Sequence, residues 1–255
     1  ARYGRPLAHL VHNHRQLAHH RVADDGANFP IWNSEWIRAE HPEWRGPSIV
    51  CHPPSAGADH KTTNAKRATA RTATLVNLLG EKGGPLFWRL AERCPGWRFQ
   101  GVTGAYGFQN VPDPVPANGV VVAQTTDMAP VWKATGVLLV PSFYESWSMT
   151  AVEAVASGIP VVAARTPGLR ESMISPEHGD CAIFCDFDDD EQWVDALARL
   201  EKVTEWRRWS KLARLRSAEL DALSVSDLDR LDAWCPSDLQ GRRAPALGPD
   251  LRANP

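Results

Sequence analysis

The sequence has no hydrophobic run long enough to cross a membrane. Its longest apolar stretches, such as residues 137–140, are short, whereas a transmembrane helix needs about 20 apolar residues. It also lacks a strong net charge: the value of -2 supplies no overall field that would direct the chain to nucleic acid or to an acidic membrane. Hydrophobic residues make up 43% and charged residues 23%, which is typical of a globular rather than a disordered protein.

A disulfide framework and a metal-ligand set are also missing. The cysteines are odd in number and scattered: Cys51, Cys94, Cys181, Cys185 and Cys235. This pattern indicates reduced thiols in a cytoplasmic protein. The N-terminal histidines have no standard ligand spacing: His9, His12, His14, His19 and His20. We therefore expect no bound metal. The chain has no signal peptide and no initiator Met, so we also expect that upstream residues are missing.

Short apolar strands alternate with helices from about residue 71 to residue 200. The runs 137–140 and 159–163 are continuously apolar, as strands buried on both faces should be. This alternation predicts an α/β fold with a parallel, doubly wound sheet. Before this region, Ser34 is expected to cap a helix over 35–40, and 52–70 is expected to be a loop.

The segment 141–163 carries the strongest chemical signal. A buried strand ends at Pro141, and a helix begins near Ser148, whose side chain is expected to cap the first amides. A helix N-terminus at the carboxyl end of a strand suits a phosphate group. Glu145 lies before that position and Glu153 lies about one turn inside the helix. Because carboxylates accept hydrogen bonds from hydroxyls, the pattern indicates a polyhydroxylated ligand on both sides of a phosphate, as in a nucleotide sugar.

These two glutamates have seven residues between them and lie between a Pro-Ser pair and Gly158-Ile-Pro-Val-Val. They resemble the signature of the retaining family-four glycosyltransferases (glycosyl transferases group 1). Other segments resemble the same family in the right order, over about residues 8 to 200 in all. They are 11–14, 33–36, 49–54, 77–84, 95–102 and 166–171. The resemblance implies a GT-B fold, in which two Rossmann-like domains face each other.

The resemblance also implies roles for particular residues. Glu145 would contact the donor sugar and Glu153 the ribose, while Lys82 would stabilise the leaving diphosphate. Around them, the amides of Ser148, Met149 and Thr150 would meet the diphosphate, Gly83 belongs to the phosphate-binding loop, Gly104 and Tyr106 lie in the loop near the base, and His12 would face the donor from the acceptor domain. Trp147, between the glutamates, is placed to pack under the sugar. No cofactor or protein-bound metal is implied.

The resemblance further implies the organisation and the partners of the chain. Residues 1–54 would form a partial, truncated acceptor domain and the crossover, 55–225 the donor-binding domain, and 226–255 a C-terminal helix and irregular tail. The donor would be UDP- or GDP-linked. The acceptor stays open among a glycan, a lipid, a metabolite, a protein and modified DNA. Retention at the anomeric carbon is implied only by the resemblance.

Several alternatives remain at this stage. The family usually has an arginine shortly before the lysine, and this chain has Asn77, Leu78 and Leu79 there. That departure and the short first domain favour a non-catalytic nucleotide-sugar binding module, or a subunit or oligomer whose partner supplies the missing half. A different two-domain enzyme, such as a sugar-nucleotide epimerase, fits the glutamate spacing less well. Glu145 and Glu153 are also compatible with a plain helix start, and Lys82 with an ordinary turn.

Overall fold

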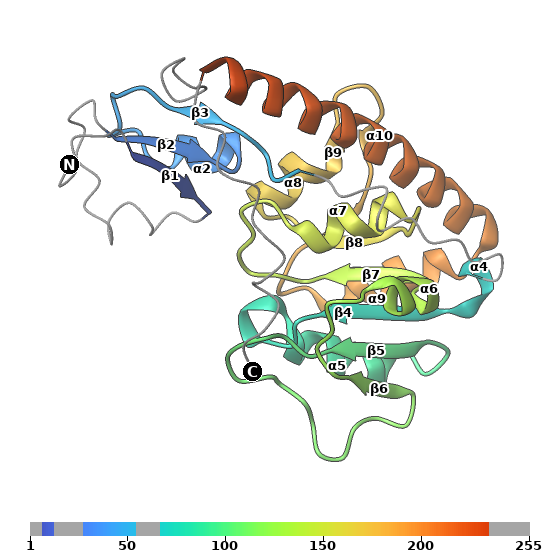
Figure 1. The fold of residues 1–255 in the computed structure, drawn as a ribbon. Helices are drawn as coiled ribbons and strands as arrows, with labels where there is room; N and C mark the ends of the chain where they lie inside the picture. Colours follow the sequence, from blue (N-terminus) through green and yellow to red (C-terminus); the bar gives the residue numbers. More distant parts are fainter. Residues whose placement is uncertain (1–6, 13–27, 55–66, 235–255) are drawn as a thin grey trace.

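The structure is a computed structural model that describes residues 7–12, 28–54 and 67–234. Within these ranges the strands form two larger parallel sheets and a small antiparallel pair. Figure 1 shows the three-stranded sheet lying beside one end of the six-stranded sheet. We call residues 7–12 and 28–54 the N-terminal unit, and residues 67–234 the C-terminal unit.

The six-stranded sheet is the framework of the C-terminal unit. Its order is β11-β8-β7-β4-β5-β6, and all its neighbouring strands are parallel. The strands are β4 (Thr72–Val76), β5 (Arg98–Val102), β6 (Gly119–Val122), β7 (Val137–Val140), β8 (Val161–Ala164) and β11 (Ile183–Cys185). The chain starts at β4, moves outward through β5 and β6, and returns to β7 on the other side of β4. The topological switch point, where open α/β sheets bind ligands, therefore lies between β4 and β7.

Helices connect these strands and bury the sheet. They are α4 (Arg67–Ala70), the 3-10 turn η1 (Gly80–Lys82), α5 (Gly84–Arg93), α6 (Ala129–Ala134), α7 (Met149–Ala156), α8 (Pro167–Met173), α9 (Asp190–Leu200) and α10 (Val203–Trp234). A short hairpin, β9 (Ile174–Ser175) with β10 (Gly179–Asp180), follows α8. Every residue of β7 and β8 is buried, which explains why both strands are continuously apolar. The predicted α/β fold with a parallel, doubly wound sheet is confirmed.

The N-terminal unit contains β1 (Leu7–Val11), β2 (Asn28–Trp32), α2 (Glu35–Ala39) and β3 (Ile49–Val50) in one parallel sheet of order β1-β2-β3. Ser34 caps α2, because its Oγ accepts the Ile37 N–H at 3.1 Å. That prediction is confirmed. Val11, Trp32, Ile37 and Val50 form a small separate core. Because this core is small, the contacts to the C-terminal unit matter for holding the unit in place.

The last helix links the two units. In Figure 1, α10 extends from beside α4 to the vicinity of β3. It passes residue 225 without a break, so the expected boundary there falls inside a helix, and the domain division stays a prediction. The expected loop over 52–70 lies mostly outside the described residues. Residues 52–54 have no regular structure, as expected, but residues 67–70 form the helix α4, so the loop prediction was wrong there. None of the described helices has both the length and the apolar composition needed to cross a membrane.

Candidate functional site

A cavity of about 320 Å³ opens at the carboxyl ends of β4, β5, β6 and β7. It lies at the topological switch point, where the strand order predicts a ligand site. The lining residues come from four loops: Val76, Asn77, Lys82, Val102, Thr103, Gly104, Ala105, Gln124, Thr125, Met128, Glu145, Ser148, Met149 and Thr150. Six of the predicted site residues are therefore brought together in one cavity (Lys82, Gly104, Glu145, Ser148, Met149 and Thr150).

Lys82 and Glu145 form an ion pair across the cavity. The Lys82 Nζ lies 2.9 Å from Glu145 Oε1, although 63 residues separate them. Ser142 Oγ donates to the same carboxylate oxygen at 2.8 Å. Both charged side chains are mostly shielded, with 22% and 13% of their surfaces exposed. The pair therefore places one fixed cation and one carboxylate side by side in a partly dry site, where a charged ligand would compete for each of them.

The loops that carry this pair approach each other closely. The Phe143 N–H donates to the Glu81 carbonyl at 2.9 Å. Gly83 has a left-handed backbone, with φ of 85°, and an added Cβ would lie 2.4 Å from the Pro141 carbonyl oxygen. Only glycine fits both conditions. Gly83 thus allows the loop after β4 to reach the loop after β7.

The N-terminus of α7 faces the cavity, but Ser148 does not cap it as expected. Ser148 precedes the helix with φ of 75° and ψ of 86°, and its side chain accepts no capping hydrogen bond. The prediction was wrong because a side-chain cap needs an extended residue at that position, whereas Ser148 is left-handed. The first amides of the helix consequently have no side-chain cap from Ser148, and this arrangement favours an anionic ligand. A left-handed backbone at a residue other than glycine is strained, and such strained residues are found most often at functional sites.

The sequence analysis missed Gln109, which organises the far side of the cavity. Its Oε1 accepts the Leu78 N–H at 2.9 Å and the Gly104 N–H at 2.8 Å. Its Nε2 donates to Asn77 Oδ1 at 3.3 Å and to the Tyr106 carbonyl at 2.9 Å. One side chain therefore joins the loop after β4 to the loop after β5. No local sequence signal marks it, because its partners lie up to 32 residues away.

Replacing Gln109 with Glu should loosen this wall of the cavity. The carboxylate would keep the two acceptor contacts but would oppose the oxygen atoms of Asn77 and Tyr106. We expect the free energy of unfolding to fall by about 1–3 kcal/mol, the usual cost of leaving polar groups unpaired. Urea titration would measure this. Gln124→Glu adds the same charge at an exposed position of the same cavity. An equal loss of unfolding free energy in both variants would contradict the role assigned to Gln109.

The other predicted residues are not in the lining of the cavity. Glu153 is half-buried in α7, Gly83 joins η1 to α5, and Tyr106 is exposed at the loop after β5. Trp147 is only 3% exposed, which leaves its ring little surface for direct contact with a ligand. His12 is an exposed residue at the end of β1, in the N-terminal unit. The roles of all five stay predictions.

The cysteines and the acidic clusters contribute little to this site. Burial raises the pKa of Cys181 to about 11 and that of Cys185 to about 12, so both thiols stay protonated near neutral pH. Among the described residues, Glu177, His178 and Glu219 lie close enough to hold a cation, and none of them lines the cavity. The chemistry available in the cavity is therefore a lysine cation, a carboxylate and a helix N-terminus, a combination that suits a phosphorylated, hydroxyl-bearing ligand.

Comparison with known proteins agrees with this geometry. Residues 97–202 match the model of the family described as glycosyl transferases group 1. The chain is 43% identical over 74 residues to the D-inositol 3-phosphate glycosyltransferase of Corynebacterium kroppenstedtii, a match that covers 29% of this chain and 16% of that protein. It is 32% identical over 139 residues to the protein of the same name from Mycobacteroides abscessus, covering 47% and 29% of the two chains. The matches thus span less than a third of either relative.

A solved structure extends the likeness to most of the chain. The fold superposes on the Anabaena HepE protein, solved in complex with UDP-glucose, with a TM-score of 0.73, covering 90% of this chain and 72% of that chain. The sequence identity is 17%, so this likeness concerns the fold. The predicted GT-B fold class and the resemblance to this glycosyltransferase family are both confirmed.

Proposed function

We propose, from the match of residues 97–202 to the model of the glycosyl transferases group 1 family, that this protein transfers a sugar from a nucleoside-diphosphate sugar to an acceptor hydroxyl. One observation carries the proposal. The Lys82–Glu145 pair lies beside the N-terminus of α7 in a cavity at the switch point of the sheet. That arrangement supplies a cation and amides for a diphosphate and a carboxylate for sugar hydroxyls. UDP and GDP are the first nucleotides to consider, and UDP-glucose is the ligand of the HepE structure.

Different residues bind different parts of the donor. Lys82 and the amides of Ser148, Met149 and Thr150 bind the diphosphate. Glu145 accepts hydrogen bonds from the sugar, and Glu153 accepts them from the ribose. When the diphosphate binds, Lys82 exchanges its contact with Glu145 for one with phosphate oxygens, which leaves the carboxylate available to the sugar hydroxyls. The loop of Gly104 and Tyr106, held by Gln109, lies beside the base.

The proposed chemistry is dissociative and needs no enzymatic nucleophile. The bond between the anomeric carbon and the diphosphate oxygen breaks, and the electron pair leaves with the diphosphate. Lys82 and the α7 N-terminus stabilise the charge that develops there, which is the contribution that preorganised donors make to a transition state. The acceptor oxygen then bonds to the anomeric carbon on the face that the diphosphate left, and its proton passes to a phosphate oxygen. This geometry gives retention.

Calorimetric titration tests the proposal at its centre. UDP, GDP, ADP and their common sugar conjugates are titrated into the wild type and into Glu153→Ala. We expect one nucleotide to bind at micromolar strength, and the variant to lose about 10- to 100-fold in affinity, the range for a hydrogen bond to a charged group. Glu92→Ala, which removes an exposed carboxylate on α5, serves as the matched control. The absence of binding by every nucleotide would contradict the proposal.

A nucleotide-sugar binding module without transfer is a second candidate. The observation that favours it is the segment Asn77-Leu78-Leu79, where the resembled family has an arginine. The same titration combined with an assay of nucleotide release separates the candidates. A module binds the donor and releases no diphosphate over hours, whereas an enzyme hydrolyses it slowly even without its acceptor.

A further inference from the structure

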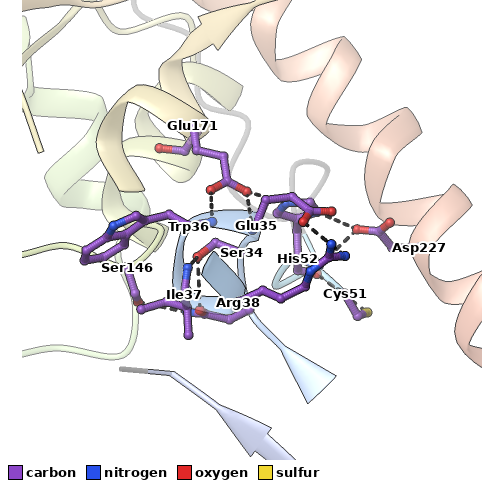
Figure 2. Close-up of polar contacts among 12 residues, drawn as sticks. Ser34, Glu35, Trp36, Ile37, Arg38, Cys51, His52, Ser146, Glu171 and Asp227 are labelled. Carbon is purple, nitrogen blue, oxygen red and sulfur yellow. Dashed lines mark hydrogen bonds and ion pairs between the residues drawn. The ribbon is translucent and has the colours of Figure 1, made fainter. Parts of the chain in front are cut away.

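The N-terminal unit meets the C-terminal unit through a cluster of polar contacts, most of them partly or fully buried, shown in Figure 2. Asn33 Nδ2 donates to Ser146 Oγ at 2.8 Å. The Glu171 carboxylate of α8 accepts the backbone N–H groups of Glu35 and Trp36, at 2.7 Å and 2.9 Å. We call this set of contacts the seam. It joins segments more than 100 residues apart. We call residues 142–148 the donor loop. This loop includes Glu145, which lines the cavity, and Ser146, which belongs to the seam.

His52 is the central residue of the seam. Its Nδ1 lies 2.6 Å from Asp227 Oδ2, and its Nε2 lies 2.9 Å from Glu171 Oε1. A neutral imidazole carries one N–H and would turn a lone pair toward one of these carboxylates. An imidazolium donates from both nitrogens. Because Asp227 is fully buried and each ring nitrogen lies within 2.9 Å of a carboxylate oxygen, the geometry favours the charged form.

We propose that His52 is a positioning residue of the candidate site: as an imidazolium between Asp227 and Glu171, it holds the donor loop, and with it Glu145, in place against the N-terminal unit. The part of this proposal that concerns sugar binding rests on the proposed function. The part that concerns the charge of His52 and the order of the donor loop does not.

The connection from His52 to Glu145 is short. The Trp147 ring lies against His52, with a centroid distance of 4.4 Å, and Ser146 is bonded to Asn33. The two residues that directly follow Glu145 are thus both held by the N-terminal unit. Without the imidazolium, the two carboxylates would face each other across the seam, and their repulsion would act on the elements that support the donor loop.

α10 also fixes the position of Glu171. Arg216 donates to the Glu171 carbonyl at 2.9 Å and to the Ser172 carbonyl at 2.8 Å. Because Arg216 is 5% exposed, these contacts are shielded from solvent. The carboxylate that accepts the hydrogen bond from His52 Nε2 is therefore carried on an anchored helix. A change at His52 should consequently act on α8 as well as on the Glu171 side chain.

The charges around His52 set the expected pH dependence. Those on neighbouring elements are Asp227 and Arg230 of α10, Glu171 of α8, Glu35 and Arg38 of α2, and the Cys51 thiol beside β3. Arg230 pairs with the other oxygen of Asp227 at 3.0 Å. Burial lowers the pKa of His52, but the hydrogen bonds and charges of Glu171 and Asp227 outweigh it, and the net pKa is raised above 6.5. The stabilisation is consequently complete below pH 6.5 and is lost as the pH rises through the higher folded-state pKa.

Nuclear magnetic resonance of protein labelled with 15N-histidine tests the charge directly, without nucleotide. His52→Gln identifies the signal by its loss. We expect both ring nitrogens of His52 to be protonated at pH 6.5 and to titrate at a higher pH. Asp227→Asn, which keeps the side-chain size, should lower the midpoint. A midpoint at or below 6.5 in the wild type, or a single protonated nitrogen at pH 6.5, would overturn the proposal.

Hydrogen exchange and ligand affinity test the positioning. At pH 6.5, His52→Gln should speed amide exchange in the donor loop by about tenfold, the size expected for losing a charge-assisted contact. His178→Gln, a histidine near carboxylates away from the seam, should leave it unchanged. His52→Gln should also weaken UDP-glucose about tenfold and UDP less than about threefold. Unchanged exchange would overturn the positioning role. If the wild type bound neither ligand, the proposed function would fail, and exchange would still decide this inference.

Discussion

Replacing Lys82 with Ala is expected to slow release of the nucleoside diphosphate from the donor sugar by about 100- to 1,000-fold, or about 3–4 kcal/mol in the activation barrier. Lys82 is a cation in the lining of the cavity, held 2.9 Å from Glu145. Its largest effect should come when charge develops on the departing diphosphate. The rate is measured by nucleotide release with water as acceptor, at saturating concentration of the donor identified by calorimetry. Saturation separates the catalytic effect from weaker binding.

Two further variants make the Lys82 result specific. Lys211→Ala removes an exposed lysine of α10 and should leave the rate unchanged. Lys82→Arg keeps the charge but spreads it over a planar group with a different reach, so it should recover part of the rate. A Lys82→Ala rate within threefold of the wild type, at an unchanged melting temperature, would show that Lys82 does not stabilise the leaving group.

The second large effect is expected at Gly168, which packs under the donor loop. A Cβ added there would lie 2.3 Å from the Glu145 carbonyl oxygen and 2.5 Å from the Ser146 carbonyl carbon. These are backbone atoms, so the loop must move. Displacing a catalytic group by about 1 Å can cost about 100-fold in rate. We therefore expect Gly168→Ala to reduce nucleotide release about 100-fold, and the free energy of unfolding to fall by about 1–3 kcal/mol, as for other overpacked sites.

The sign of the stability change makes this prediction informative. Gly168 lies in the first turn of α8, where alanine has the better helix propensity by about 1 kcal/mol. Propensity alone would stabilise the variant, so only the clash can destabilise it. Gly96→Ala is the matched control, because the first atoms that its Cβ would meet are 3.9 Å and 4.0 Å away. An equal melting temperature for both variants would show that the donor loop tolerates the added methyl group.

Local patterns in the sequence were sufficient for the fold and for part of the site. Continuous apolar runs identified β7 and β8 as buried parallel strands, and Ser34 was recognised as a helix cap. The expected cap at Ser148 failed for a local reason that the sequence does not show. A serine before a helix usually adopts an extended backbone, but here φ is 75°. The loop between Pro141 and α7 sets that angle, and its conformation depends on contacts with Glu81 and Gly168.

The sequence by itself determined which residues are candidates for binding a nucleotide sugar, because residue type and spacing decide which groups follow which strand. Only the tertiary structure decided how those residues act together. The pairs Lys82–Glu145, Asn33–Ser146 and His52–Asp227 span 63, 113 and 175 residues. Strand order and the path of α10 bring these pairs into contact. The physical reason is that the charge of His52 and the position of Glu145 both depend on contacts with residues far away in the sequence. No local sequence pattern specifies those contacts.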